Sequence, residues 1–125
     1  MDDSSDKKFQ KELNGGLVGL VLLAVLADSD DDLYGYEIAK RLANANDGTS
    51  IFKEGTIYPV LRALSAGALL TSRIVPSYSG PPRRYYRITD QGRSVLAEWR
   101  QIWQSTRDFV DRFTEIENSN TGHST

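Results

Sequence analysis

Apolar residues recur at helical spacing along the first part of the chain. Between about Lys8 and Ala27 they predict a first helix with a broad apolar face, made of Phe9, Leu13, Leu17, Leu20, Val21 and Ala24. Gly15 and Gly16 weaken this helix midway and favour a bend or close packing there. The acidic run at 28–32 ends the helix, and we expect it to form a solvated loop that can cap the next helix.

Two shorter helices follow the acidic run. One is predicted from about Tyr34 to Asn44, with Gly48 as the left-handed residue that closes it. The other covers roughly Glu54 to Ala66, and its inward residues are Ile57, Val60, Leu61 and Leu64. Pro59 deprives the third helix of a hydrogen bond, so that helix either starts later or is slightly distorted.

Two strands are predicted after Gly67, at residues 69–76 and 83–88, joined by the sequence SYSGPP. Alternation along the second strand divides its side chains between two faces: Arg84, Tyr86 and Ile88 on one, and Arg83, Tyr85 and Arg87 on the other. One of the two tyrosines, Tyr85 or Tyr86, is expected to face the core.

A long last helix is predicted from a cap at Thr89 or Asp90 to about Glu117. At 1.5 Å per residue it would be about 40 Å long, which is more than a small three-helix core can cover. Its apolar residues nevertheless continue along its whole length: Val95, Leu96, Trp99, Ile102, Trp103, Phe109, Val110, Phe113 and Ile116. The excess apolar stripe therefore needs a partner.

The chain of 125 residues has room for one core, and we expect polar, disordered ends at 1–7 and 118–125. It has no cysteine, which excludes disulfides and thiolate zinc sites and fits a reducing interior. The apolar run at 17–27 is too short to span a bilayer and follows an acidic head, so it resembles neither a membrane span nor a signal peptide. We expect a cytoplasmic protein.

The net charge of −2 hides an asymmetry. Residues 50–93 carry seven basic and two acidic side chains, a local charge of +5, whereas the rest of the chain carries −7. The middle of the chain would attract a polyanion and the ends would repel it. The sequence GPPRRYYR at 80–87 concentrates this positive charge beside a turn.

Three helices followed by a two-stranded hairpin is the element order of a winged helix. We therefore predict a mainly α protein with a small β-hairpin, in which residues 8–89 form a winged helix-turn-helix domain that binds DNA. The third helix would enter the major groove, and SYSGPPRR would be the tip and rising edge of the wing, with its arginines near phosphates. Residues 90–117 would form a dimerisation helix.

Four successive segments also resemble the signatures of the PadR family of transcriptional regulators: LYGYEIAKRL (33–42), EGTIYPVLRAL (54–64), GALLTSR (67–73) and GPPRRYYRITDQGR (80–93). The resemblance covers roughly Leu17 to Trp103. It implies a winged-helix dimer that represses transcription, and the single helix after the wing is similar to that of the smaller subfamily. One departure is Lys53. Family members often have a Ser or similar capping residue at this position, so this chain loses the cap and gains a positive charge beside DNA.

The candidate DNA contacts lie in the third helix, the wing and the approach to the second helix: Lys53, Thr56, Tyr58, Arg62, Arg83, Arg84, Arg87 and Tyr34. Tyr58 would contact DNA through its hydroxyl, the alternative being an aromatic at the core edge. Arg62 either faces the groove or pairs with an acid on the second helix. Tyr34 reaches a phosphate, whereas Tyr36 packs the second helix onto the third. The wing arginines are either phosphate contacts or a solvated charged strand.

Some family members bind flat hydrophobic compounds in a pore at the dimer centre, against a tryptophan that aligns here with Trp103. For Trp103 a ligand contact and plain dimer core are both open, and for Trp99 dimer core is favoured. Phe9 and Leu13 of the partner's first helix would supply the facing wall. The resemblance thus implies a homodimer through the first and last helices and a hydrophobic effector.

The sequence offers no evident catalytic or metal site, because it has one histidine, His123, and no phosphate-binding loop. We predict no cofactor and no enzyme activity. The alternative function is a winged-helix protein-interaction module that does not touch DNA.

Overall fold

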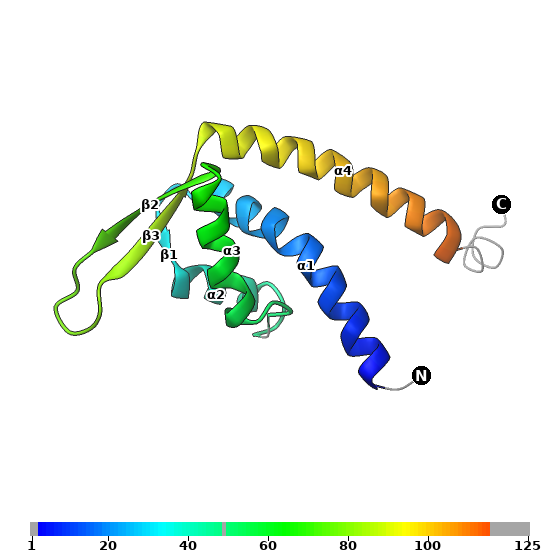
Figure 1. The fold of residues 1–125 in the computed structure, drawn as a ribbon, viewed down its shortest axis with the longest axis horizontal. Helices are drawn as coiled ribbons and strands as arrows, with labels where there is room; N and C mark the ends of the chain where they lie inside the picture. Colours follow the sequence, from blue (N-terminus) through cyan, green and yellow to red (C-terminus); the bar gives the residue numbers. More distant parts are fainter. Residues whose placement is uncertain (1–2, 49, 116–125) are drawn as a thin grey trace.

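The structure is a computed structural model, which describes residues 3–48 and 50–115. It contains four helices and three strands in these residues, in the order α1 (Asp3–Ala27), β1 (Leu33–Tyr34), α2 (Gly35–Asn44), α3 (Glu54–Ala66), β2 (Leu70–Val75), β3 (Arg83–Ile88) and α4 (Asp90–Thr114). Figure 1 shows the β2–β3 hairpin projecting from one side of the domain, while α1 and α4 diverge on the other.

One hydrophobic core joins the second half of α1 to α2, α3, the sheet and the first turns of α4. Its most deeply buried side chains are Leu22, Leu23, Ile38, Ile57, Leu61 and Leu70. Ile57 and Leu61 belong to the inward face that the sequence predicts for α3. In α1 the predicted apolar face is not the core face: the core residues are Val18, Leu22, Leu23 and Leu26, whereas the predicted Leu17, Leu20, Val21 and Ala24 are only partly buried, and Phe9 and Leu13 are exposed. The N-terminal half of α1 and the C-terminal half of α4 extend beyond this core (Figure 1).

The sheet has the strand order β1–β3–β2, with both pairs antiparallel. The hairpin strands agree with the predicted ones, and the predicted alternation is confirmed because Tyr86 and Ile88 are buried. The two-residue strand β1 was not predicted; it pairs Leu33 with Tyr86 and Tyr34 with Tyr85. A mostly helical domain with this small sheet is a winged helix.

Both long helices depart from their predicted ends. Helix α1 begins at Asp3 rather than Lys8, so residues 3–7 continue the helix instead of fraying. A side-chain carbon at Gly15 or Gly16 would meet no atom within 4 Å, so neither glycine is there to allow close packing among the described residues. Helix α4 ends at Thr114, three residues before the predicted end, and the predicted tail at 118–125 lies outside the described residues.

The helix starts show which residues act as caps. The Thr89 hydroxyl accepts a hydrogen bond from the Gly92 amide at 2.9 Å, which confirms Thr89 as the cap of α4. Gly92 lies directly against the Leu69 carbonyl, where a Cβ atom would overlap the backbone. Helix α2 is not capped by the acidic run: its first free amide, that of Tyr34, donates to Glu37 Oε1 at 3.1 Å. Lys53 provides no side-chain cap for α3, as expected.

By length and composition, residues 4–27 of α1 are long and apolar enough to cross a membrane, although only part of that stretch is buried. Its inward face nevertheless supplies Val18, Leu22 and Leu23 to the centre of the core. A helix that spans a bilayer could not bury these side chains against α3 and the sheet. We therefore assign α1 to the core of the winged-helix domain.

Candidate nucleic-acid interface

Helix α3 presents a flat outer face. Ile57, Leu61 and Leu64 anchor it in the core, which turns the opposite side of the helix to the outside. The exposed residues on that side are mainly small: Gly55, Pro59, Arg62, Ala63 and Ala66. Pro59 does not delay the start of the helix: α3 runs without interruption from Glu54 to Ala66, with Pro59 on its exposed side. A face with few long side chains can approach another molecule closely.

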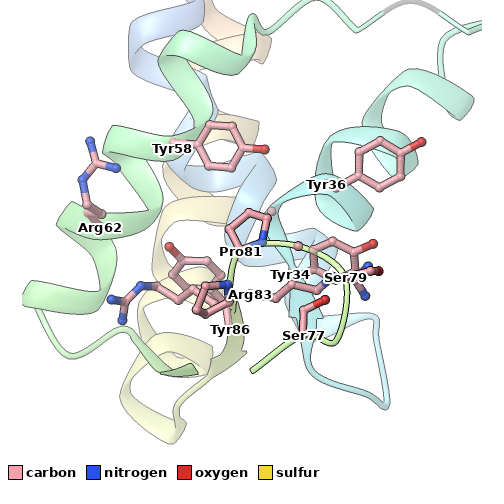
Figure 2. Close-up of a pocket in the computed structure, with 13 residues that line it drawn as sticks. Tyr34, Tyr36, Tyr58, Arg62, Ser77, Ser79, Pro81, Arg83 and Tyr86 are labelled. Carbon is pink, nitrogen blue, oxygen red and sulfur yellow. The ribbon is translucent and has the colours of Figure 1, made fainter. Parts of the chain in front are cut away.

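A cleft lies between α3, the start of α2 and the tip of the wing (Figure 2). Its volume is about 430 Å³. It is lined by tyrosines, arginines and the turn of the wing: Tyr34, Gly35, Tyr36, Tyr58, Arg62, Ser77, Ser79, Gly80, Pro81, Pro82, Arg83, Arg84 and Tyr86. No carboxylate lines this wing cleft, so its field is positive and its polar groups are hydroxyls and guanidinium donors.

Aromatic rings hold the arginine at the start of β3. The Arg83 guanidinium carbon lies 4.5 Å from the centre of the Tyr34 ring, close enough for a cation–π contact. The Tyr34 ring in turn packs against Tyr85 at 5.3 Å and Tyr36 at 6.2 Å between centroids. A hydrogen bond with the Tyr85 side chain is the main cause that raises the pKa of Arg83, and the electrostatic effect of Tyr34 is the second. This exposed guanidinium therefore stays charged. Tyr34 therefore positions Arg83.

The second wing arginine is fixed by a hydrogen bond across the hairpin. Arg84 Nη1 donates to Ser72 Oγ at 3.1 Å, and this leaves other guanidinium hydrogens free to bind a partner. Arg83 and Arg84 are consecutive residues of β3, and both line the wing cleft.

The Tyr58 side chain extends from α3 toward α2 and is half-buried. Its ring lies over Gly35, where a Cβ atom would overlap it. Burial, followed by the negative charge of Glu54, raises the pKa of Tyr58, so the hydroxyl is protonated at neutral pH and can donate. The hydroxyl makes no hydrogen bond to the residues that the structure describes, and Figure 2 shows it in the wing cleft. The ring is thus structural, and the hydroxyl is free for a partner.

The structural role predicted for Tyr36 is wrong. Its side chain is 59% exposed and lines the wing cleft, whereas Gly35 and Tyr58 make the close contact between α2 and α3. Helical spacing contained this signal, since Ile38 and Leu42 define the buried face of α2 and Tyr36 lies on a different one. Tyr36 is therefore an additional candidate contact.

Arg87 lies outside the wing cleft and binds a carboxylate of the acidic run. Its Nε is 2.6 Å from Asp32 Oδ1, and Arg73 Nε is 3.0 Å from Asp32 Oδ2. Only 11% of the Asp32 side chain is exposed, and the hydrogen bond from Arg87 is the main cause that lowers its pKa. Asp32 is therefore not part of a solvated loop. It neutralises Arg87 and ties the base of the wing to β1.

The remaining predicted contacts lie on α3. Arg62 is exposed and lines the wing cleft, and it forms no ion pair with an acid of α2 in the described part of the chain. Lys53 and Thr56 lie on the other side of α3, in a second cleft that faces α1. The predicted DNA contacts thus fall into two groups on either side of α3, with Arg87 apart from both.

The two tryptophans line an apolar groove of about 460 Å³ between α1 and α4 of the same chain. The half-buried Trp99 ring packs on Gly19, where a Cβ atom would lie 3.4 Å from it. Trp103 and Leu13 also line this tryptophan groove, whereas Phe9 does not and is 66% exposed.

Within residues 3–48 and 50–115, no three His, Asp or Glu side chains converge as a metal site would require.

Comparisons with known proteins agree with this geometry. Residues 22–98, which run from the core half of α1 into α4, match the family described as "Transcriptional regulator PadR-like family". The chain is a member of the PadR-like family. The predicted resemblance is thereby confirmed, and the family is one of transcriptional regulators rather than of enzymes.

Individual known proteins also match most of the chain. An uncharacterised protein of Lysinibacillus sphaericus is 30% identical over 103 residues, which are 82% of this chain and 92% of that protein. Transcriptional regulator YqjI of Escherichia coli is 34% identical over 92 residues, and these are only 42% of its own length. The crystal structure of a PadR family transcriptional regulator from Eggerthella lenta has a TM-score of 0.70 at 32% identity and covers 91% of this chain and 96% of that one.

Proposed function

We propose that this PadR-like regulator is a dimeric repressor that binds a pseudo-palindromic operator. Helix α3 of each protomer would enter the major groove with its flat outer face, and the wing would contact the flanking backbone. The observation that carries the proposal is the wing cleft, where Arg83, Arg84 and the Tyr58 hydroxyl converge beside α3 without a carboxylate. We infer that the protein acts in the cytoplasm, where its DNA is.

The charge distribution supports a polyanion as the partner. The hairpin of β2 and β3 carries four arginines and no acidic residue, in a chain whose net charge is −2. Phosphates would therefore be attracted to one part of the surface and repelled by the rest, which orients the protein on a duplex. Arg83 and Arg84 would bind phosphates, and Tyr36 and Tyr58 would donate hydrogen bonds to the same backbone.

The uncovered part of α4 supports a homodimer. Leu96, near the start of α4, is buried in the core, and farther along the helix the apolar side chains Ile102, Phe109, Val110 and Phe113 are exposed. Phe9 and Leu13 of α1 are exposed as well. A second copy of the chain would cover this surface through α4 and α1 and would hold two α3 helices at a fixed separation.

The tryptophan groove supports a hydrophobic or aromatic effector. Trp99, Trp103 and Leu13 provide flat and apolar walls, and the groove lies next to the surface that the second copy would cover. A compound bound there would contact both helices that hold the dimer together. The dimer would have two forms that differ in the separation of the α3 helices. The compound would relieve repression only to the extent that it binds one form more tightly than the other.

A salt titration of DNA binding tests the repressor proposal. The duplex is taken from the region upstream of the protein's own gene, with a scrambled duplex as reference. Tight, sequence-selective binding should weaken steeply with salt. Arg83→Ala with Arg84→Ala should flatten the logarithmic salt dependence by about 0.9 per phosphate contact that is lost.

A charge-matched variant controls for the loss of two arginines. Arg100→Ala with Arg112→Ala removes two exposed arginines of α4 that lie outside the wing cleft, and its affinity should stay close to that of the wild type. Equal, weak binding of both duplexes, unchanged in the wing variant, would instead favour a protein-interaction module.

A further inference from the structure

A second cleft borders α3 on the side away from the wing. It has a volume of about 610 Å³ and lies between the N-terminal half of α1 and the start of α3. Its lining residues are Lys7, Gln10, Lys11, Asn14, Gly15, Ile51, Phe52, Lys53 and Thr56. We call it the α1 cleft.

The floor of the α1 cleft is fixed by hydrogen bonds. Asn14 Nδ2 donates to the Ile51 carbonyl at 3.0 Å, across 37 residues of sequence, and Gln10 Nε2 donates to Asn14 Oδ1 at 2.7 Å. The neighbouring Phe52 is 5% exposed and is anchored in the core. The segment that leads into α3 is therefore attached to α1, and the lysines of α1 are held beside the start of α3.

The α1 cleft is positive and unneutralised. Three of its lining residues are exposed lysines, Lys7, Lys11 and Lys53, and none of its lining residues is acidic. No ion pair among the described residues engages these lysines. A surface that collects three ammonium groups without a carboxylate fits an anionic partner with several charges.

The basic residues of the α1 cleft lie on the face of α1 opposite to its exposed apolar residues, Phe9 and Leu13. At about 100° per residue, Lys7, Lys11 and Asn14 fall on one side of the helix, and Phe9, Leu13 and Gly16 fall about 200° away. The apolar side is where the tryptophan groove lies, since Leu13 and Gly16 line it. A second copy that covers the apolar side would leave the lysines accessible.

The two clefts flank the outer face of α3. Tyr58 opens onto the wing cleft and Thr56 onto the α1 cleft. Pro59 and Ala63, both exposed, lie between these two positions around the helix. When α3 enters a major groove, one DNA strand runs along each side of it. The wing would reach one strand, and the α1 cleft faces the other.

We propose that the N-terminal half of α1 is a third DNA-binding element, in which Lys7, Lys11 and Lys53 bind phosphates of the strand that the wing does not contact. This inference rests on the proposed function and extends it. It gives α1 two roles on opposite faces, dimer contact and DNA contact. The affinity of this regulator for DNA would then depend on a helix that lies outside the helix-turn-helix and the wing.

The test compares two charge-matched variants of the full chain on the duplex that the wild type selects. Lys7→Ala with Lys11→Ala should weaken binding at least about tenfold near 0.1 M salt and flatten the logarithmic salt dependence by about 0.9 per lost contact. The control, Lys8→Ala with Arg100→Ala, removes two charges that do not line the cleft and should stay within about twofold of the wild type. Thermal unfolding should be unchanged for both variants, because all four side chains are exposed.

Ethylation interference then locates the contacts on the DNA. The Lys7 and Lys11 variant should lose interference at phosphates that differ from those lost by the Arg83 and Arg84 variant. If the lysine variant keeps the wild-type affinity and pattern while the wing variant loses them, the role of α1 is refuted and the repressor proposal stands. If the wild-type protein selects no duplex, both proposals fail.

Discussion

Gly35 shows how a single position links the core to the interface. Because it has no side chain, the Tyr58 ring can lie directly on the first turn of α2. That contact packs α3 closely on α2, and Tyr58 and Tyr36 both line the wing cleft. The segment Tyr34-Gly35-Tyr36 thus combines one packing residue with two tyrosines that line the wing cleft, and the packing role that the sequence predicted for Tyr36 belongs to Gly35.

Asp32 is the residue whose loss we expect to loosen the wing. Its carboxylate binds Arg73 on β2 and Arg87 on β3, so it connects both strands of the hairpin to β1. Asp32→Asn should lower the free energy of unfolding at pH 7 by about 1 kcal/mol, since the two arginines are largely exposed and solvent weakens each pair. Urea unfolding of the two proteins measures this difference.

The dependence of this difference on pH follows from the lowered pKa of Asp32. A carboxyl whose pKa is lower in the folded state than the unfolded value of about 3.9 stabilises the fold above that unfolded value. The contribution falls as the pH drops through the folded pKa. Wild type and Asp32→Asn should therefore converge in stability as the pH falls through the folded pKa of Asp32, and a difference that stays constant throughout an acid titration from pH 7 would contradict the ion-pair explanation.

At the scale of elements, α4 changes its environment along its length. Its first turns cover the core, and its second half carries Phe109 and Phe113 in edge-to-face contact at 5.1 Å on the exposed side. Phe109→Glu with Phe113→Glu should convert the dimer to a monomer, because the charges would have to be buried between two copies. Sedimentation equilibrium measures the change in mass.

The control for this substitution lies on the other side of α4. Gln101→Glu with Gln104→Glu adds the same two charges at exposed positions away from the apolar stripe, and the protein should remain dimeric. A wild-type protein that is monomeric at the concentrations tested would contradict the proposed interface. So would a Phe109 and Phe113 variant that still forms the dimer.

The elements that the sequence predicts well are those with a strong local signal. Helix α3 was predicted with its observed bounds, since Ile57, Leu61 and Leu64 recur at helical spacing and Gly67 ends the run. Strand β1 was missed because two residues carry no periodicity, and it exists only through pairing with β3. The role of Asp32 was missed for the same reason: its partners lie 41 and 55 residues away in the sequence.

The candidate site was predicted in part for a related physical reason. Residue type and the order of elements predicted the wing arginines and the start of α3. They could not separate Arg87 from Arg83 and Arg84, because all three belong to one strand and differ only in what packs against them. Lys7 and Lys11 belong to a helix that was predicted to begin after residue 7, so their position beside Lys53 became visible only in the fold.

At the scale of the whole molecule, α1 and α4 form a V that opens away from α2, α3 and the wing (Figure 1). The tryptophan groove is lined by residues of both arms of the V. In the dimer proposed above, a change in the angle of the V would move α3 relative to the second copy, because α1 packs directly on α3. Trp103 lies on α4 and Leu13 on α1, so a compound between them contacts both arms. The groove is thus placed to influence the spacing of the two α3 helices.

Linkage gives this effector proposal a strict test. A flat aromatic dye that enters the groove should quench the fluorescence of Trp99 and Trp103 and weaken operator binding by about 5- to 150-fold, the usual range of allosteric coupling. Thermodynamic reciprocity then requires the operator to weaken dye binding by the same factor. Titrating the dye into free and operator-bound protein measures both sides. A dye that binds both forms equally occupies the groove without acting as an effector, because a ligand shifts an equilibrium only by its difference in affinity for the two states.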